Sequence, residues 1–370
     1  MNVKAAAALV VALAVAAAPV QLSHAQAQQT PTPAVANIPV GQAPRVAALT
    51  PDGSTLVVPN LNSSSVSLID TATNTVKATV QLPGRVNNVA VNPAGTEVYA
   101  AAVDGKRITI INLATAEATS KIDLESEPNY LALNKKGDRL YAITNNSPSI
   151  TVMDPRRREV IKVVPLEQVP FRLALSPNGK RLVVSLADVE KVVVFNTVNN
   201  RVIAEVKTGK QPARATFNGD STRAYVANWE SGDISVIDLK TNKVVQTLAV
   251  GTNPVPPAID DKLNRLITAA AGDNTLIAMN LRSGKVVRKV QVGARPWQIL
   301  ANANFTRVFT PNYGDGTVSV ICVGGNWSTQ TLQAQAGPIW LVGGPALYSM
   351  NTEGNSVSVF APAALGASCK

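Results

Sequence analysis

The sequence SVIDLKTNKVV, residues 235–245, alternates apolar and polar residues and then breaks at a Thr-Asn pair. This pattern predicts the end of one short β-strand, a tight turn and the start of the next strand. Similar stretches return every 42 residues, and the residue that ends the strand falls at Asp70, Asn112, Asp154, Asn196, Asp238, Asn280 and Cys322. Self-similarity at a fixed period of this length is typical of a repeat architecture.

A recurring proline keeps step with that strand end. It falls at Pro44, Pro128, Pro170, Pro212, Pro254, Pro296 and Pro338, with Val86 in the one gap. Each unit contains four short strand signals separated by turns rich in Gly, Asn, Asp and Ser. We expect the Asx residue at the strand end to accept hydrogen bonds from the turn backbone, which makes it turn chemistry and not a catalytic carboxylate. Four-stranded units of this length arranged in a ring form a β-propeller.

The two ends of the repeat predict how the ring closes. Seven complete units run from about residue 43 to 336, followed by three more strand signals, PIWLVG, ALYSMN and SVSVFA. A lone strand signal, AVANIPV, precedes the first unit and resembles the missing outer strand. We therefore predict an all-β propeller of eight blades, closed by one N-terminal and three C-terminal strands, because this pairing leaves no blade with a broken edge. Seven blades with an irregular appendage is the alternative.

The N-terminus has the pattern of a secretory signal. MNVK is followed by the apolar run AAAALVVALAVAAA and by SHAQA, a small-x-small cleavage pattern. That run is shorter than the roughly 20 residues of a membrane span. The predicted organisation is a signal peptide at 1–27, a linker at 28–33, one propeller domain at 34–362 and a C-terminal tail at 363–370. We expect an exported monomer, periplasmic, extracellular or at the cell surface, with no transmembrane segment after processing.

Histidine and cysteine usage restricts the chemistry. The single histidine, His24, falls in the predicted signal peptide. The processed chain would then have no imidazole for a Ser-His-Asp or Cys-His arrangement, or for zinc, copper or haem iron. We predict no catalytic residue, no metal site and no cofactor, and an enzyme is less expected than a non-enzyme. A disulfide between Cys322 and Cys369 is predicted for an oxidising compartment, the alternative being a buried thiol at 322 and a free one in the tail.

The units AYVANWESGDISVIDLKTNKVVQTLAVGTNP and LYAITNNSPSITVMD resemble the YVTN-repeat β-propeller family of exported proteins. The resemblance covers about residues 38 to 361 and implies a periplasmic or surface-layer protein of bacteria or archaea. Some members are similar to periplasmic proteins that bind single-stranded DNA. WD40 and quinoprotein propellers fit less well, since their GH, WD and tryptophan motifs are absent. Lactonases and the haem-binding domain of nitrite reductases are wider relatives, but both depend on side chains, histidine among them, that the processed chain lacks.

Residues around the recurring proline, with those of the loop between the second and third strands, should ring a funnel on one face of the propeller. Arginines among aromatic and amide side chains suit an anionic ligand with flat groups. The candidate ligand-binding residues are Arg45, Arg85, Asn88, Tyr130, Arg172, Arg214, Trp229, Arg295, Trp297, Gln298, Tyr313 and Trp340.

The formal net charge of +10 also favours an anionic partner. The sequence therefore predicts a non-enzymatic propeller that binds an anionic ligand or polymer at its funnel, with single-stranded nucleic acid as the most specific version. The alternatives are a structural or adhesive platform for envelope proteins and a histidine-independent enzyme of the lyase or lactonase kind.

Overall fold

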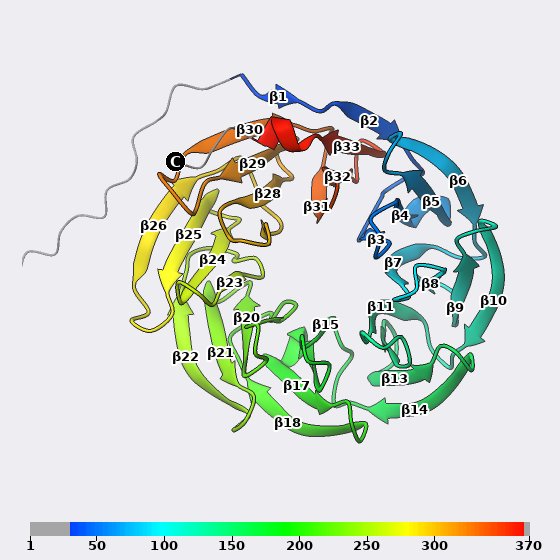
Figure 1. Ribbon diagram of the computed structural model, residues 1–370. Coiled ribbons are helices and arrows are strands. Elements are labelled where there is room, and N and C mark those ends of the chain that lie inside the picture. The colour runs from blue at the N-terminus through cyan, green and yellow to red at the C-terminus, as the bar shows by residue number, and fades with distance from the viewer. Residues whose placement is uncertain (1–29, 366–370) are drawn as a thin grey trace, which may run out of the picture.

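The computed structural model describes residues 30–365 and shows a closed ring of eight blades around a central opening (Figure 1). Each blade contains four antiparallel strands, of which the innermost lines the centre and the outermost lies at the outer edge of the ring. This confirms the predicted eight-bladed all-β propeller. No helix within residues 30–365 is long and apolar enough to cross a membrane. The predicted signal peptide lies outside the described residues.

The first four blades follow the chain order. Their strands are β3 (Ala48–Leu49), β4 (Thr55–Asn60), β5 (Ser65–Asp70) and β6 (Thr75–Gln81) in blade 1; β7 (Val86–Val91), β8 (Glu97–Ala102), β9 (Arg107–Asn112) and β10 (Glu117–Asp123) in blade 2; β11 (Pro128–Leu133), β12 (Leu140–Thr144), β13 (Ser149–Asp154) and β14 (Glu159–Pro165) in blade 3; and β15 (Arg172–Leu175), β16 (Arg181–Leu186), β17 (Lys191–Asn196) and β18 (Arg201–Lys207) in blade 4.

The next three blades repeat this order. Their strands are β19 (Thr216–Phe217), β20 (Arg223–Asn228), β21 (Asp233–Asp238) and β22 (Lys243–Ala249) in blade 5; β23 (Ala258–Asp260), β24 (Arg265–Ala270), β25 (Thr275–Asn280) and β26 (Val286–Gln291) in blade 6; and β27 (Leu300–Ala301), β28 (Val308–Asn312), β29 (Thr317–Ile321) and β30 (Thr329–Gln333) in blade 7. Short 3-10 helices occupy Leu61–Ser63 (η1), Ala187–Val189 (η2) and Pro362–Leu365 (η3).

Blade 8 joins the two ends of the chain. It combines β31 (Pro338–Gly343), β32 (Leu347–Asn351) and β33 (Ser356–Phe360) with the N-terminal β2 (Ala36–Pro39), which pairs antiparallel with β33. Figure 1 shows β2 lying along β33 on the outer edge of the ring. The predicted closure is confirmed. The sequence did not predict β1 (Thr32–Pro33), which adds to the edge of blade 7 by pairing parallel with β30.

Turn chemistry explains why the Asx residue recurs. The Asp238 carboxylate accepts hydrogen bonds from the backbone N–H groups of Lys240 and Thr241, at 3.0 and 2.8 Å. Asp70 makes the same pair of bonds in blade 1. The hydrogen bonds that Asp238 accepts from the backbone, above all the one from Thr241, hold the pKa of Asp238 below its usual range. Asn242 then adopts the left-handed conformation, with φ at 55°, which asparagine tolerates well. The Asx residue is turn chemistry, as predicted.

A buried asparagine ties the second strand of a blade to the third. In blade 1 the Asn60 Nδ2 donates to the hydroxyls of Ser65 and Ser67, at 3.1 and 2.9 Å. Asn312 and Asn351 donate to two hydroxyls in the same way, and Asn228 donates to the Asp233 carboxylate and the Ser235 hydroxyl. The backbone packs tightly against this side chain, since a Cβ at Gly41 would lie 2.7 Å from the Asn60 Cβ. The glycine three residues before the recurring proline is therefore required by close approach.

Replacing Asn60 with alanine should lower the free energy of unfolding by about 1–3 kcal/mol, because two buried serine hydroxyls lose their partner. Chemical denaturation measures this change. Asn62, exposed two residues away, is the matched control, and Asn62→Ala should leave the unfolding midpoint unchanged. Equal midpoints for both variants would show that the asparagine network contributes little.

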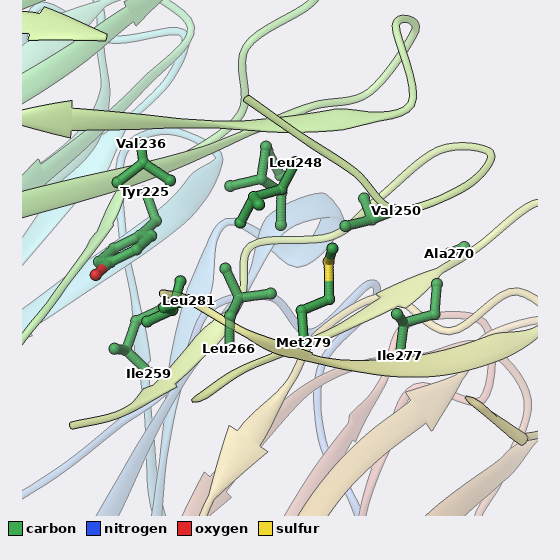
Figure 2. Packing of buried hydrophobic residues seen from close by; sticks show 12 residues of the cluster. Tyr225, Val236, Leu248, Val250, Ile259, Leu266, Ala270, Ile277, Met279 and Leu281 are labelled. Atoms are coloured by element: carbon green, nitrogen blue, oxygen red, sulfur yellow. The ribbon is translucent and has the colours of Figure 1, made fainter. Parts of the chain in front are cut away.

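Eight apolar clusters, one between each pair of neighbouring blades, hold the described ring together. Figure 2 shows the cluster between blades 5 and 6, where Tyr225 and Val236 face Leu266 and Met279. The second strands of all blades are almost wholly buried, so each presents apolar side chains to both neighbours. The clusters that include blade 8 close the ring, with Ile38 of β2 packed among residues of blades 8 and 1.

Candidate functional site

The first residues of the innermost strands converge at one mouth of the central channel. Arg172 begins β15, and its guanidinium carbon lies 4.3 Å from the ring centroid of Tyr130 in β11 and 3.9 Å from that of Phe171. Its Nη1 also donates to the Phe171 carbonyl oxygen at 3.0 Å. Stacking against two rings fixes the guanidinium in place while leaving most of its N–H donors free for a ligand.

Arg214 reaches across the channel. It precedes β19 in blade 5, yet its guanidinium carbon lies 5.2 Å from the ring centroid of Trp340 in β31 of blade 8. β31 lies across the central opening from β15, the innermost strand of blade 4, which is next to blade 5 (Figure 1). The mouth of the channel is therefore narrow enough for two long side chains from different blades to meet.

Arg45, Arg172 and Arg214, here called the channel arginines, form no ion pair with any carboxylate of residues 30–365. Burial lowers the pKa of Arg214, and the charge of Arg172 lowers it further. Burial also lowers the pKa of Arg172, with a further contribution from Arg45. In both cases the Tyr130 hydroxyl partly offsets the decrease. The channel arginines are thus a concentrated, partly desolvated positive charge without an acidic partner.

Carboxylates on the same face are used to hold loops. Asp104, Asp273 and Asp315 accept backbone N–H bonds from Arg85, Thr252 and Ala294, at 2.7, 2.9 and 2.8 Å. These acids cap the turn before the innermost strand in blades 2, 6 and 7. They are bound at the rim and do not neutralise the centre.

An aromatic wall lies over blades 5 to 7 and consists of Trp229, Trp297 and Tyr313. The Trp229 and Trp297 ring centroids are 5.5 Å apart in an edge-to-face arrangement, and Trp297 and Tyr313 are 6.1 Å apart. The Tyr313 hydroxyl donates to Glu353 of blade 8. The Arg295 guanidinium carbon lies 5.1 Å from the Tyr313 ring. These contacts hold a row of rings at the rim, with Trp297 about two-fifths exposed.

Apolar side chains line the channel wall beside the arginines. A cavity of about 350 Å³ borders the innermost strands of blades 3, 4 and 5, and Arg214 lies at one end of its lining, with Leu131, Leu173, Leu175, Thr216 and Phe217 among the other residues. This volume falls within the range of small-ligand sites. Arg214 therefore borders an apolar surface.

The predicted site residues fall into groups. Arg45, Tyr130, Arg172, Arg214 and Trp340 meet at the channel mouth, and Trp229, Arg295, Trp297 and Tyr313 meet at the aromatic wall. Sequence reasoning did not include Glu353, which the Tyr313 hydroxyl contacts from the loop after β32. Its only signal was its place in a loop between second and third strands.

Three predicted residues serve the frame instead. The Asn88 Oδ1 accepts from the Leu131 backbone N–H at 3.0 Å. Gln298 accepts from the Leu341 N–H at 2.7 Å and donates to the Leu341 carbonyl at 3.4 Å. Both amides join neighbouring innermost strands. Arg85 pairs with Asp104 at 3.2 Å on the exposed rim, where an ion pair contributes little.

The predicted disulfide involves Cys322, which directly follows β29 of blade 7. Cys322 is disulfide-bonded, and Cys369 lies outside the described residues. The pairing of these two cysteines stays a prediction. No group of three His, Cys, Asp or Glu side chains within residues 30–365 is arranged to hold a metal ion.

Solved structures support the fold. The Kuenenia stuttgartiensis hydrazine synthase is similar with a TM-score of 0.62 at 18% identity, covering 82% of this chain and 99% of that one. The dihydro-heme d1 dehydrogenase NirN in complex with DHE is similar with a TM-score of 0.67 at 14% identity, covering 82% of this chain and 70% of that one. No curated protein sequence matches the chain significantly.

The family model of the cytochrome D1 heme domain matches residues 52–261. The β-propeller is thus confirmed, whereas no comparison supports the YVTN-repeat family specifically. The match also contradicts the predicted function, a non-enzymatic propeller for nucleic acid or another anionic polymer, because it points to a heme-related redox or enzymatic role. Neither alternative, the adhesive platform or the lactonase-like enzyme, gains support. The missing histidine had wrongly set heme-domain relatives aside. The match covers more than half of the 370 residues of the chain, so the chain belongs to the cytochrome D1 heme domain family.

Proposed function

We propose that this chain holds a carboxylate-bearing tetrapyrrole of the heme type over its funnel and serves a heme-related redox or enzymatic role. The family match supports the choice of ligand. The unpaired positive charge of the channel arginines is the observation that supports this position for the ligand. A partly desolvated guanidinium without a counter-ion is costly, and a carboxylate ligand would offset that cost.

The rim and the face of a heme fit the residues that are present. Porphyrin carboxylates can accept paired N–H bonds from a guanidinium fork, the geometry in which arginine binds carboxylates best. The aromatic wall and the apolar channel lining suit a flat conjugated ring, which packs against aromatic side chains by stacking or edge contacts. Charge and apolar surface are therefore placed side by side at the channel mouth.

The iron of a heme finds no imidazole in the described residues. His24, the one histidine of the chain, falls outside them. Cys322 is disulfide-bonded, and the methionines Met153, Met279 and Met350 are buried within the blades. The residues present therefore fit the rim and the face of the tetrapyrrole, but not the usual axial ligands of its iron.

A heme-type group supplies electron-transfer and redox chemistry at its iron when it is bound. The contribution of this chain would be binding and orientation. Arg172 and Arg214 would hold the carboxylates, and Tyr130 and Phe171 would keep Arg172 in position through their ring contacts. Trp297 and its neighbours would shield one edge of the ring from water.

We place this role outside the cytoplasm. Support comes from the secretory pattern of residues 1–27, with its charged start, apolar run and small-x-small cleavage pattern. Cell fractionation with an antibody against the chain tests this placement, and recovery only from the cytoplasm would contradict it.

The proposed function is tested by titrating the purified chain with hemin while following tryptophan emission. Three of the four tryptophans, Trp229, Trp297 and Trp340, lie in the funnel, so a bound tetrapyrrole, which absorbs where tryptophan emits, should quench most of the signal. The fourth, Trp327, packs against Arg265 in the outer part of blades 6 and 7, and Trp327→Phe provides a cleaner background. We expect saturable quenching at one hemin per chain, weakened by salt. Quenching no greater than that of free tryptophan at the same hemin concentration would overturn the proposal.

A further inference from the structure

We propose that this site recognises the rim and the face of the tetrapyrrole and not its metal, so that a metal-free porphyrin with free carboxylates binds as tightly as hemin. This inference rests on the proposed function and specifies the class of ligand that the site accepts. Two observations support it: the side chains of the funnel that could bind iron are already used in other contacts, and the channel arginines are free to bind carboxylates.

The phenols at the funnel are the closest alternatives to histidine as iron ligands. Tyr313 is engaged, since its hydroxyl donates to Glu353. That hydrogen bond, together with burial, raises the pKa of Tyr313, which opposes the phenolate form that iron requires. The remaining buried phenols are enclosed in the blades, at Tyr99, Tyr141, Tyr225 and Tyr348.

Tyr130 has a different role in the structure. One face of its ring carries the Arg172 guanidinium, at 4.3 Å from the ring centroid. Phe171 contacts the same guanidinium at 3.9 Å without any hydroxyl. Because Phe171 makes this contact with a ring alone, the contact does not require a hydroxyl and rests on the ring of Tyr130. We therefore assign Tyr130 as a positioning residue for Arg172.

The positive charges of the site are suited to bind the carboxylates at the edge of a ligand. The channel arginines come from blades 1, 4 and 5 and converge without carboxylate partners. On the same face, Asp104, Asp273 and Asp315 accept hydrogen bonds from loop backbone. Guanidinium groups repel a metal cation and attract carboxylates. Binding energy should therefore come from arginine–carboxylate bonds and ring contacts, which are the same with or without iron.

The experiment compares three probes on the Trp327→Phe chain: hemin, metal-free protoporphyrin, and the dimethyl ester of metal-free protoporphyrin. Tryptophan quenching gives each dissociation constant. The expected result is that hemin and the metal-free acid agree within about threefold, while the ester binds about tenfold or more weakly, because it has lost the charge-assisted hydrogen bonds.

Hemin binding about tenfold or more tightly than the metal-free acid would overturn the inference and leave the proposed function standing. Tyr130→Phe then identifies the cause: loss of that preference in the variant would assign Tyr130 as an iron ligand, contrary to its positioning role. Ester and acid binding equally would also overturn the inference, since carboxylates would then not matter. Failure of all three probes to bind would overturn the proposed function itself.

Discussion

Replacing both Arg172 and Arg214 with glutamine is expected to weaken hemin binding by about a hundredfold or more. Each charge-assisted hydrogen bond to a carboxylate contributes about 1.5–3 kcal/mol, and each 1.4 kcal/mol corresponds to about a tenfold change in affinity. Glutamine keeps a polar side chain in the channel and removes the charge. Neither arginine forms an ion pair within the described residues, so the fold should tolerate the change.

The matched control is Arg282→Gln, which removes a positive charge from an exposed turn between β25 and β26. It lowers the net charge without touching the funnel. We expect its hemin affinity to equal that of the unaltered chain, and the thermal unfolding of the double variant to match as well. An unchanged dissociation constant in the double variant, with the fold intact, would contradict the location of the site.

Replacing Leu266 with alanine should destabilise the chain by about 2–5 kcal/mol. Leu266 is fully buried in β24 and packs in the cluster between blades 5 and 6 (Figure 2). Truncating a buried leucine removes apolar burial and leaves a cavity that a rigid sheet cannot close. Denaturation in urea, followed by circular dichroism, measures the loss as a lower unfolding midpoint.

Leu263 provides the control, because it lies three residues earlier and is 60% exposed. Leu263→Ala should shift the unfolding free energy by less than about 0.5 kcal/mol. Equal midpoints for the two leucine variants would mean that the clusters between blades do not dominate the stability of the ring.

Much of the fold could be predicted because local chemistry repeats. Asp70 and Asp238 mark the same turn by accepting the same backbone hydrogen bonds, so their spacing reports blade length directly. The N-terminal strand β2 carries the alternation of an outer strand, and its pairing with β33 followed from the need to complete a blade. In contrast, β1 is a two-residue parallel addition at Thr32–Pro33. So short a segment has no period to detect.

The site was only partly predictable. Strand starts located Arg172 and Arg214, since each blade brings its first residues to the same mouth. The contact between Arg214 and Trp340 spans the channel and depends on side-chain reach, which a repeat pattern does not encode. Gln298 follows its recurring proline at the same distance as Arg172 and Arg214, but its amide joins two innermost strands by bonding to the Leu341 backbone. The lack of histidine was also a poor guide, because residues 52–261 match the cytochrome D1 heme domain without containing one.

A crystal structure of the chain grown with hemin would locate the ligand directly. We expect a macrocycle at the channel mouth, with its carboxylate oxygens about 2.7–2.9 Å from guanidinium nitrogens of Arg172 or Arg214 and its ring beside the aromatic wall. A macrocycle ordered on the outer strands, or one whose carboxylates face solvent away from the channel arginines, would contradict this expectation.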